Sequence, residues 1–208
     1  MKRLAILGAS GHGKVVADTA ECSGWQVIEF FDDAWPKLSS IGGWPVRGKT
    51  KDLLGRVAEY DGVLVAIGNN RVRLEKLQQL KSAGAHLPVL VHPSAVISRY
   101  ASIGPGSVVF ASVVVNAYAV IGEGAILNTG CSIDHDCIVG NCVHVSPGAR
   151  LAGTVNVGDG SWIGIGACVR QVTTIGANVL IGAGAAVVCD ISDNMIATGV
   201  PARAVSRD

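Results

Sequence analysis

Three consecutive residues, Asp134, His135 and Asp136, stand out in a region whose other outward positions are mostly small or apolar. A neighbouring carboxylate orients an imidazole and makes it more basic, which is what a general base requires. The triplet therefore predicts a site that abstracts a proton, with His135 as the base. A solvated histidine in a polar turn is the alternative.

The elements that position this triplet follow a period of six. An aliphatic residue occurs at every sixth position from Val91 to Val187, in phase over seventeen positions, and the residue four later is nearly always small. This period fits neither an amphipathic helix nor an alternating strand, and it is typical of a hexapeptide β-helix with eighteen residues per coil. The sequence therefore predicts an all-β left-handed parallel β-helix with a C-terminal tail over 86–208. A β-sandwich with a chance period is the alternative.

Residues eighteen apart are vertical neighbours in such a helix, so Ala117 lies below His135 and Gly153 lies above it. A glycine at that place leaves room for a substrate, and its backbone N–H could stabilise an oxyanion close to the base. Gly153 is therefore a predicted catalytic residue.

A second histidine, His144, lies in the outward column with the largest apolar surface, which also contains Val108, Ile126, Trp162 and Leu180. Such a surface predicts contact with another subunit, which would place His144 at a subunit boundary. A histidine that only packs in that contact is the alternative.

Residues 1–85 follow another pattern, in which strands and helices alternate. The expected strands are 4–7, 26–31 and 63–67, and the expected helices are 14–22, 52–59 and 71–83, with a loop at 35–49. This order predicts an α/β domain with a small parallel, Rossmann-like sheet.

Ligands of such a sheet bind beyond the carboxyl ends of its strands. There the chain carries a glycine-rich turn at 8–13, Asp32 with Asp33, and a polar turn at 68–70. The first turn offers N–H groups at the start of a helix, which suits phosphate, and the aspartates suit a ribose or a base. The glycine spacing differs from the dinucleotide fingerprint, so NAD is disfavoured. Glycines that only permit a tight turn are the alternative.

Composition excludes several classes of protein. The formal charge of +1 argues against a nucleic-acid surface, and no apolar run approaches the roughly 18 residues of a membrane span. The first apolar run, 4–7, is too short for a signal peptide, so we expect a cytoplasmic protein with reduced cysteines. Cys137 and Cys142 lack a second ligand pair, so no metal site is expected.

These features together resemble the bacterial nucleotide-sugar acetyltransferases of the NeuD/PglD type, over nearly the whole chain. The resemblance is carried by the opening segment 7–16, the turn 67–70, the hexads with His135 and His144, and the closing Gly199-Val200-Pro201-Ala202. It implies a homotrimer that moves acetyl from acetyl-CoA to the 4-amino group of a UDP- or GDP-linked dideoxy sugar, by direct attack and without a metal. Related members are sialic acid O-acetyltransferases.

The resemblance also implies roles for single residues. His135 matches the base, Asp136 the carboxylate that polarises it (often Glu in relatives), and Gly153 the oxyanion amide. The matches for acetyl-CoA are His144, Gly153, Ile165, Gly182 and Ala183. The matches for the nucleotide sugar are Gly11, His12, Gly13, Asp32 and Asn69, with Asp33 beside them.

Three rival functions remain open. The first is O-acetylation of a sialic acid or polysaccharide hydroxyl, for which the same residues would serve. The second is a metal-dependent hydratase, in which His92, His135 and His144 would have to converge on zinc. The third is a nucleotide-sugar-binding protein without catalytic activity, against which the His135 triplet argues.

Overall fold

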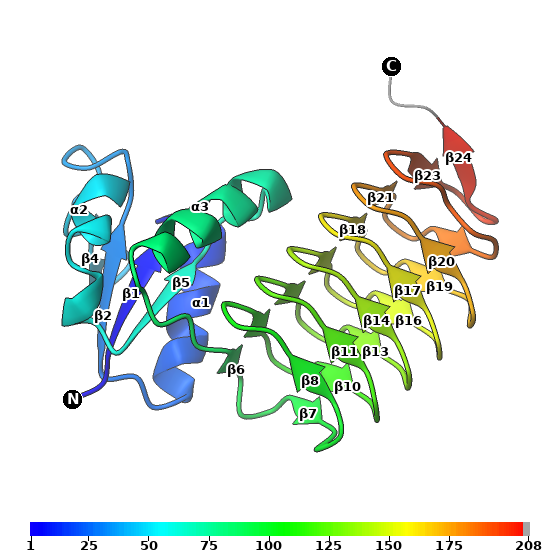
Figure 1. Ribbon diagram of the computed structural model, residues 1–208, viewed down its shortest axis with the longest axis horizontal. Coiled ribbons are helices and arrows are strands. Elements are labelled where there is room, and N and C mark those ends of the chain that lie inside the picture. The colour runs from blue at the N-terminus through cyan, green and yellow to red at the C-terminus, as the bar shows by residue number, and fades with distance from the viewer. Residues whose placement is uncertain (206–208) are drawn as a thin grey trace. The chain divides into compact units, whose positions relative to one another are not determined.

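The computed structural model describes residues 1–205 and divides the chain into two compact units, Met1–Pro93 and Ser94–Asp208 (Figure 1). The sequence placed the boundary earlier, between residues 85 and 86. The intervening segment is held by the first unit, because the Val63 amide donates to the carbonyl oxygen of His86 and the Ser23 hydroxyl donates to that of Val91.

The first unit contains a three-stranded parallel sheet in the order β2-β1-β5. Its strands are β1 (Arg3–Leu7), β2 (Val27–Phe31) and β5 (Gly62–Val65), and its helices are α1 (Gly11–Cys22), α2 (Thr50–Leu54) and α3 (Asn70–Ser82). The strands are almost fully buried, as their continuous apolar sequences require in a parallel sheet. The predicted small Rossmann-like sheet is confirmed.

Three elements of this unit differ from the sequence expectation. Helix α1 begins at Gly11 rather than Lys14, because the Lys14 amide already donates to the carbonyl oxygen of Ser10. The expected helix 52–59 is interrupted at Gly55, a poor helix former, and continues as the short 3₁₀ helix η1 (Val57–Glu59). The expected loop 35–49 contains an antiparallel hairpin of β3 (Ser40–Ile41) and β4 (Trp44–Pro45).

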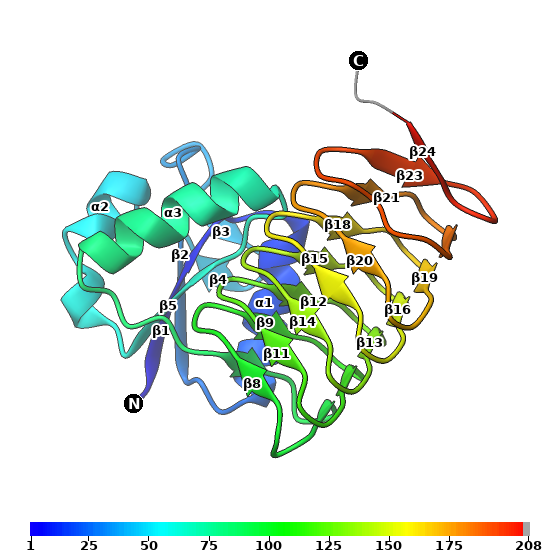
Figure 2. The same ribbon diagram turned by 45° about the vertical axis from the view of Figure 1, so that its right-hand side comes forward.

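The second unit is a parallel β-solenoid of two-residue strands, and β6 (Leu90–Val91) precedes it (Figures 1 and 2). Strands eighteen residues apart pair in parallel, for example Val114 with Ser132. The first sheet contains β7 (Val96–Ile97), β10 (Val114–Val115), β13 (Ser132–Ile133), β16 (Arg150–Leu151), β19 (Cys168–Val169) and β22 (Ala186–Val187). The second contains β8 (Ser102–Ile103), β11 (Val120–Ile121), β14 (Ile138–Val139), β17 (Asn156–Val157) and β20 (Thr174–Ile175). The third includes β9 (Val108–Val109), β12 (Ile126–Leu127), β15 (His144–Val145), β18 (Trp162–Ile163) and β21 (Leu180–Ile181).

The six-residue period forms the core of the solenoid. Every aliphatic residue of the period from Val109 to Val187 is buried, and so are the small inward residues Cys131 and Cys137. Ile97 and Ile103 are only half-buried, because they belong to the first coil. The predicted parallel β-helix is confirmed.

The C-terminal end is more ordered than the expected tail. Residues 196–198 form β23 (Ile196–Thr198), which extends the third sheet in parallel with β21. The chain then turns back as β24 (Arg203–Val205), which pairs antiparallel with β23. This hairpin covers the last coil of the third sheet, where a solenoid needs a cap. Within residues 1–205, no helix has the length and apolarity that a membrane crossing needs.

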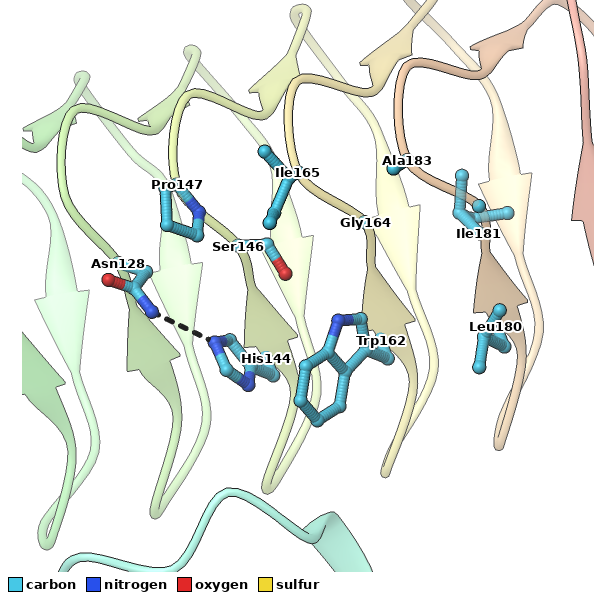
Figure 3. Close-up of a pocket in the computed structure, with 11 residues that line it drawn as sticks. Asn128, His144, Ser146, Pro147, Trp162, Gly164, Ile165, Leu180, Ile181 and Ala183 are labelled. Atoms are coloured by element: carbon cyan, nitrogen blue, oxygen red, sulfur yellow. Dashed lines mark hydrogen bonds between the residues drawn. The ribbon is translucent and has the colours of Figure 1, made fainter. Parts of the chain in front are cut away.

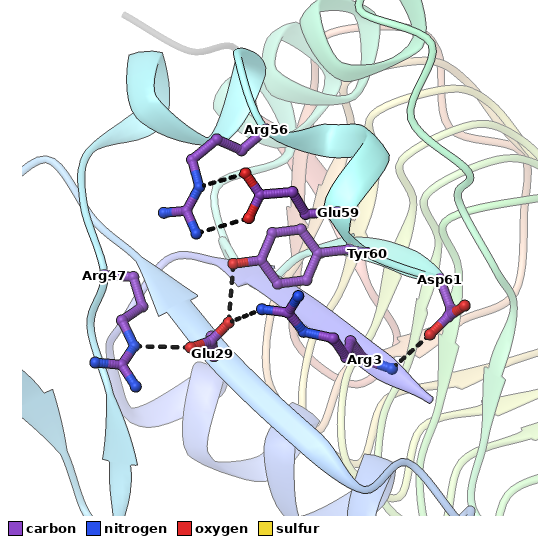
Figure 4. Close-up of polar contacts among 7 residues, drawn as sticks. All are labelled: Arg3, Glu29, Arg47, Arg56, Glu59, Tyr60 and Asp61. Carbon is purple, nitrogen blue, oxygen red and sulfur yellow. Dashed lines mark hydrogen bonds and ion pairs between the residues drawn. The ribbon is translucent and has the colours of Figure 1, made fainter. Parts of the chain in front are cut away.

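The buried carboxylate of Glu29 joins several segments of the first unit through hydrogen bonds (Figure 4). Glu29 on β2 accepts hydrogen bonds from Arg47 Nε at 2.7 Å, Arg3 Nη2 at 2.9 Å and the Tyr60 hydroxyl at 3.0 Å. Burial alone would raise the pKa of Glu29, but these three donors outweigh it and lower the pKa. The same burial and the adjacent carboxylate raise the pKa of Tyr60 to about 12.

Because its pKa is depressed on folding, Glu29 stabilises the protein above the ordinary glutamate value of 4.5, and this contribution is lost as the pH falls through its lower folded pKa. We expect Glu29→Gln to lower the free energy of unfolding at pH 7 by about 2–3 kcal/mol. The variant should also lose less stability than the wild type between pH 5 and pH 3. Urea unfolding at several pH values measures both effects. Glu75→Gln, an exposed change on α3, is the control. Equal pH dependence in wild type and Glu29→Gln would contradict the assignment.

Candidate functional site

The His135 triplet occupies the turn between β13 and β14, and its two carboxylates do different things. Asp136 Oδ2 lies 2.8 Å from His135 Nδ1. Asp134 Oδ1 instead accepts the backbone N–H of His135 at 2.8 Å and the side-chain amide of Asn116 at 2.9 Å. Asp136 is therefore the partner of the imidazole, and Asp134 shapes the turn that carries it.

The environment makes His135 more basic. The hydrogen bond that His135 donates to Asp136 raises the pKa of His135, and desolvation of the ring opposes this shift. With Nδ1 donating to the carboxylate, Nε2 carries the lone pair and is the atom that accepts a proton. The His135 side chain is 59% exposed, so a ligand can reach Nε2.

Gly153 lies directly against this ring, as the eighteen-residue spacing predicted. A Cβ atom at Gly153 would lie 2.5 Å from His135 Nε2 and 2.6 Å from Cε1, so only glycine fits against the imidazole as it stands. The coils are held in register here, because the Thr154 amide donates to the His135 carbonyl oxygen at 2.9 Å. The structure thus brings His135, Asp136 and Gly153 together.

A second cluster forms a pocket of about 450 Å³ along the third sheet and the turns that follow it (Figure 3). Four residues expected to contact acetyl-CoA line it, namely His144, Ile165, Gly182 and Ala183. The remaining lining residues are Asn128, Ser146, Pro147, Trp162, Gly164, Leu180 and Ile181. The largely apolar lining suits a ligand with a hydrocarbon portion.

The imidazole ring of His144 has a neighbour on each of two sides within this pocket. Asn128 Nδ2 lies 3.1 Å from His144 Nε2, and the His144 ring packs against the Trp162 ring at a tilt of 41°, with centroids 4.1 Å apart (Figure 3). The amide nitrogen is a donor, so Nε2 is the acceptor in this contact. Sequence analysis missed Asn128. Its position eighteen residues before Ser146, another lining residue, is the signal that could have found it.

The subunit contact expected for the outward column that contains His144 stays a prediction, because the structure holds a single chain. Leu180 keeps 36% exposure and Trp162 is half-buried, and both line the pocket. The apolar column therefore marks a ligand pocket at its C-terminal end.

The residues expected to bind a nucleotide sugar lie at the carboxyl ends of β1, β2 and β5. Several of them also stabilise the local structure. A Cβ atom at Gly13 would lie 2.5 Å from the carbonyl oxygen of Gly8, so Gly13 permits the close approach of α1 to the end of β1. Gly8 itself has φ +109°, which favours glycine. A Cβ atom at Gly11 would meet nothing, so that residue leaves open space.

The polar side chains of this region hold its loops. Asp32 accepts the amides of Ala9 and Ala34 at 2.8 and 2.9 Å. Asp33 accepts the amide and the hydroxyl of Thr50 at 2.9 and 3.0 Å. Both aspartates therefore shape the loops at the strand ends.

The polar turn at residues 67–70, which follows β5, is held by contacts with helix α3. Asn69 caps the helix by accepting the Val72 amide at 3.1 Å. Arg73 is 1% exposed and donates to the carbonyl oxygens of Ile67 and Gly68 and to the side chain of Asn70. Sequence analysis did not single out Arg73, because an arginine in a helix gives no signal of burial.

His12 is neutral near physiological pH. Burial, together with the positive charge of Arg73, lowers the pKa of His12 to about 4. The two histidines of interest therefore have opposite electrostatic surroundings, since the pKa of His135 is raised. Among residues 1–205, no group of three or more His, Cys, Asp or Glu side chains lies close enough to hold a metal ion.

Comparison with known proteins gives a consistent set of relatives. The family model described as the PglD N-terminal domain matches residues 3–80. A solved structure described as the acetyltransferase domain of PglB from Neisseria gonorrhoeae FA1090, in complex with acetyl coenzyme A, is 46% identical. The match covers 98% of this chain and 99% of that one, with a TM-score of 0.94.

Two further relatives carry more specific names. A histidine-to-asparagine variant of perosamine N-acetyltransferase from Caulobacter crescentus, in complex with CoA and GDP-perosamine, is 36% identical, with a TM-score of 0.95. That match covers 100% of this chain and 98% of the other. UDP-N-acetylbacillosamine N-acetyltransferase from Bacillus subtilis (strain 168) is 37% identical over 115 residues, which are 53% of this chain. The match spans about half the length of that curated relative, 52%.

The contact between Gly153 and His135 gives a direct test. In Gly153→Ala the new methyl group must push the imidazole away from its present place and from Asp136, so the raised pKa of His135 should fall toward 6.5. NMR titration of the histidine ring protons measures this, and Gly43→Ala, where a Cβ meets nothing, is the control. An unchanged His135 titration in a folded Gly153→Ala protein would show that the ring does not lie on this glycine.

Proposed function

Because this chain belongs to the PglD-type family of nucleotide-sugar acetyltransferases, we propose that it transfers the acetyl group of acetyl-CoA to the 4-amino group of a nucleotide-linked dideoxy sugar. The observation that carries the proposal is the oriented imidazole of His135, with Nδ1 on Asp136 and Nε2 open beside Gly153. The names of the relatives support the class of substrate, since they include a complex with acetyl coenzyme A and one with GDP-perosamine.

The chemistry follows from this arrangement as a direct attack. The sugar amine attacks the thioester carbonyl carbon, and His135 Nε2 takes the proton that the amine loses. The N–C bond forms, the tetrahedral oxyanion accepts the Gly153 N–H, and the C–S bond then breaks. The sulfur leaves with the bonding electrons and takes up the proton from His135. Asp136 stabilises the imidazolium between these two transfers.

The pocket along the third sheet is the proposed site of acetyl-CoA. Its apolar lining suits the pantetheine arm, and the His144–Asn128 pair lies at one end with Leu180 and Ile181 at the other (Figure 3). The pocket and the His135 cluster share no lining residue within the chain, which supports the homotrimer implied by the resemblance. In a trimer, the pocket of one subunit would meet His135 of its neighbour.

The nucleotide sugar is assigned to the first unit, at the carboxyl ends of its strands. The loops there are fixed by Asp32, Asp33 and Arg73, and open space remains at Gly11. A neutral His12 and the amides at the start of α1 suit an anionic diphosphate, and we assign UDP as the nucleotide.

The decisive assay supplies acetyl-CoA with UDP- or GDP-linked 4-amino-4,6-dideoxyhexoses and follows release of free thiol. The 4-hydroxy counterparts of the same sugars are the matched controls. Turnover with the amino sugars alone supports N-acetylation. Turnover with the hydroxy sugars alone would replace it with O-acetylation, and no thiol release from any acceptor would contradict acetyl transfer.

Replacing the base should leave binding intact. We expect His135→Ala to lower kcat by about 10²–10⁴, because general-base assistance is typically worth that much. The KM values of both substrates should change little, since Nε2 acts on the transferred proton. Steady-state kinetics with each substrate varied in turn provides the measurement. A near-normal kcat in this variant would remove His135 from the mechanism.

The pH profile tests Asp136. Its hydrogen bond raises the pKa of His135, so the base becomes protonated and inactive at a higher pH than an isolated histidine would. Asp136→Asn removes that charge, and the acidic limb of kcat/KM should move to lower pH while the plateau rate falls less than in His135→Ala. An acidic limb that stays in place would separate Asp136 from the titrating group.

The assignment of the pocket predicts a selective defect. Ala183→Trp should fill the space next to Ile165 and raise the KM for acetyl-CoA about tenfold or more, with the KM for the nucleotide sugar unchanged. Ala58→Trp, an exposed change in the first unit, is the matched control. Equal KM values for acetyl-CoA in the two variants would place the cofactor elsewhere.

A further inference from the structure

The three corners of the solenoid differ in one backbone feature. At each corner, successive coils place one residue in the left-handed conformation, with φ between +51° and +71°. At two of the corners most of these residues are glycine, which adopts that conformation without strain. The glycines are Gly106, Gly124 and Gly160 at one corner and Gly130, Gly148, Gly166 and Gly184 at the other.

The corner that carries His135 has no glycine at this position. Its left-handed residues are Tyr118, Asp136, Thr154 and Val172, with φ of +62°, +58°, +62° and +58°. Aspartate tolerates this conformation, and Asp136 already has its contact with His135. For bulky or β-branched residues it is an outlier, so Tyr118, Thr154 and Val172 remain to be explained. We call these three residues the base edge.

Packing within the chain does not explain the base edge. Tyr118 is 62% exposed and Val172 is 71% exposed, and Thr154 is also exposed. The Tyr118 ring stacks on Tyr100, itself 53% exposed, with centroids 5.4 Å apart, so the pair leaves aromatic surface open to solvent. Large side chains that are both strained and exposed serve neither the backbone nor the core, and backbone strain of this kind gathers at functional sites.

The base edge surrounds the proposed base. Tyr118 is the vertical neighbour of Asp136 one coil before it, and Thr154 is its neighbour one coil after, because the flanking strands pair eighteen residues apart. Thr154 directly follows Gly153, and the Val172 amide donates to the Gly153 carbonyl oxygen at 3.0 Å. Paired strands lie about 4.8 Å apart, so the base edge spans the width of a hexose ring on either side of the imidazole.

We propose that the base edge binds the hexose ring of the acceptor and aligns its amino group with His135 Nε2, an inference that rests on the acetyl transfer proposed above. Tyr118 and Val172 offer apolar surface to the ring C–H groups and to the methyl group of a 6-deoxy sugar. Thr154 offers a hydroxyl group to a ring hydroxyl beside Gly153. The nucleotide is assigned to the first unit, so the base edge recognises the sugar ring and not the nucleobase.

Glycine substitutions separate recognition from folding. Tyr118→Gly, Thr154→Gly and Val172→Gly each relax the backbone, so the melting temperature should stay the same or rise. The KM for a UDP-linked 4-amino-4,6-dideoxyhexose should rise about tenfold, while the KM for acetyl-CoA stays unchanged. Ser112→Gly is the matched control, since Ser112 is exposed and has φ +60° at another corner. It should gain stability and keep both KM values.

A second measurement needs no turnover. In saturation-transfer NMR with the same UDP-linked sugar, the wild type should saturate the sugar ring and C6 methyl protons. In the Thr154→Gly, Val172→Gly double variant this saturation should fall relative to the uracil protons. Tyr118→Phe, which keeps the ring, should behave as the wild type.

Three outcomes overturn the proposal. They are unchanged acceptor KM in all three glycine variants, a loss of oligomer mass by light scattering in those variants, and a wild-type NMR spectrum without saturation of the sugar. A wild type that binds the sugar through the base edge but releases no thiol would instead overturn only the acetyl transfer.

Discussion

The constant coil of eighteen residues is the constraint on which the second unit depends. No residue is inserted or deleted in the period between Val91 and Val187, so each outward side chain has a fixed neighbour in the next coil. That register places Gly153 on the ring of His135. An insertion of one residue between them would exchange inward and outward positions in the later coils and carry Gly153 away from the base.

Within that register, the turn decides what each charged group does. Asp134 and Asp136 flank His135 symmetrically in the sequence, yet only Asp136 reaches the imidazole. Asp136 has φ +58°, and its amide donates to Ala117 in the coil before, whereas Asp134 is held by Asn116. The orienting carboxylate is therefore selected by backbone geometry, which composition and spacing do not reveal.

Sequence patterns predicted those parts of the molecule in which one periodicity fixes many contacts. The parallel sheet, the solenoid and the contact between His135 and Gly153 follow from such periodicities. What the patterns did not predict depends on single side-chain contacts. Arg73 is buried against the turn just before its own helix, where it donates to the carbonyl oxygens of Ile67 and Gly68, and an arginine in a helix gives no signal of such burial. The sequence did not predict the hairpin of β23 and β24, because the hairpin begins after the regular period has ended. It pairs with β21, a strand of the last regular coil.

Each unit contains a histidine whose pKa is shifted, and the two shifts have opposite directions. Burial and Arg73 keep His12 uncharged down to a pH of about 4, so the proposed nucleotide site keeps one charge state over the range in which proteins normally function. His135 is exposed and Asp136 raises its pKa, so this ring holds a proton more tightly than an isolated histidine does. Of these two histidines, His135 is therefore the one suited to take up the proton in the proposed reaction, while His12 adds no charge to the proposed nucleotide site above a pH of about 4.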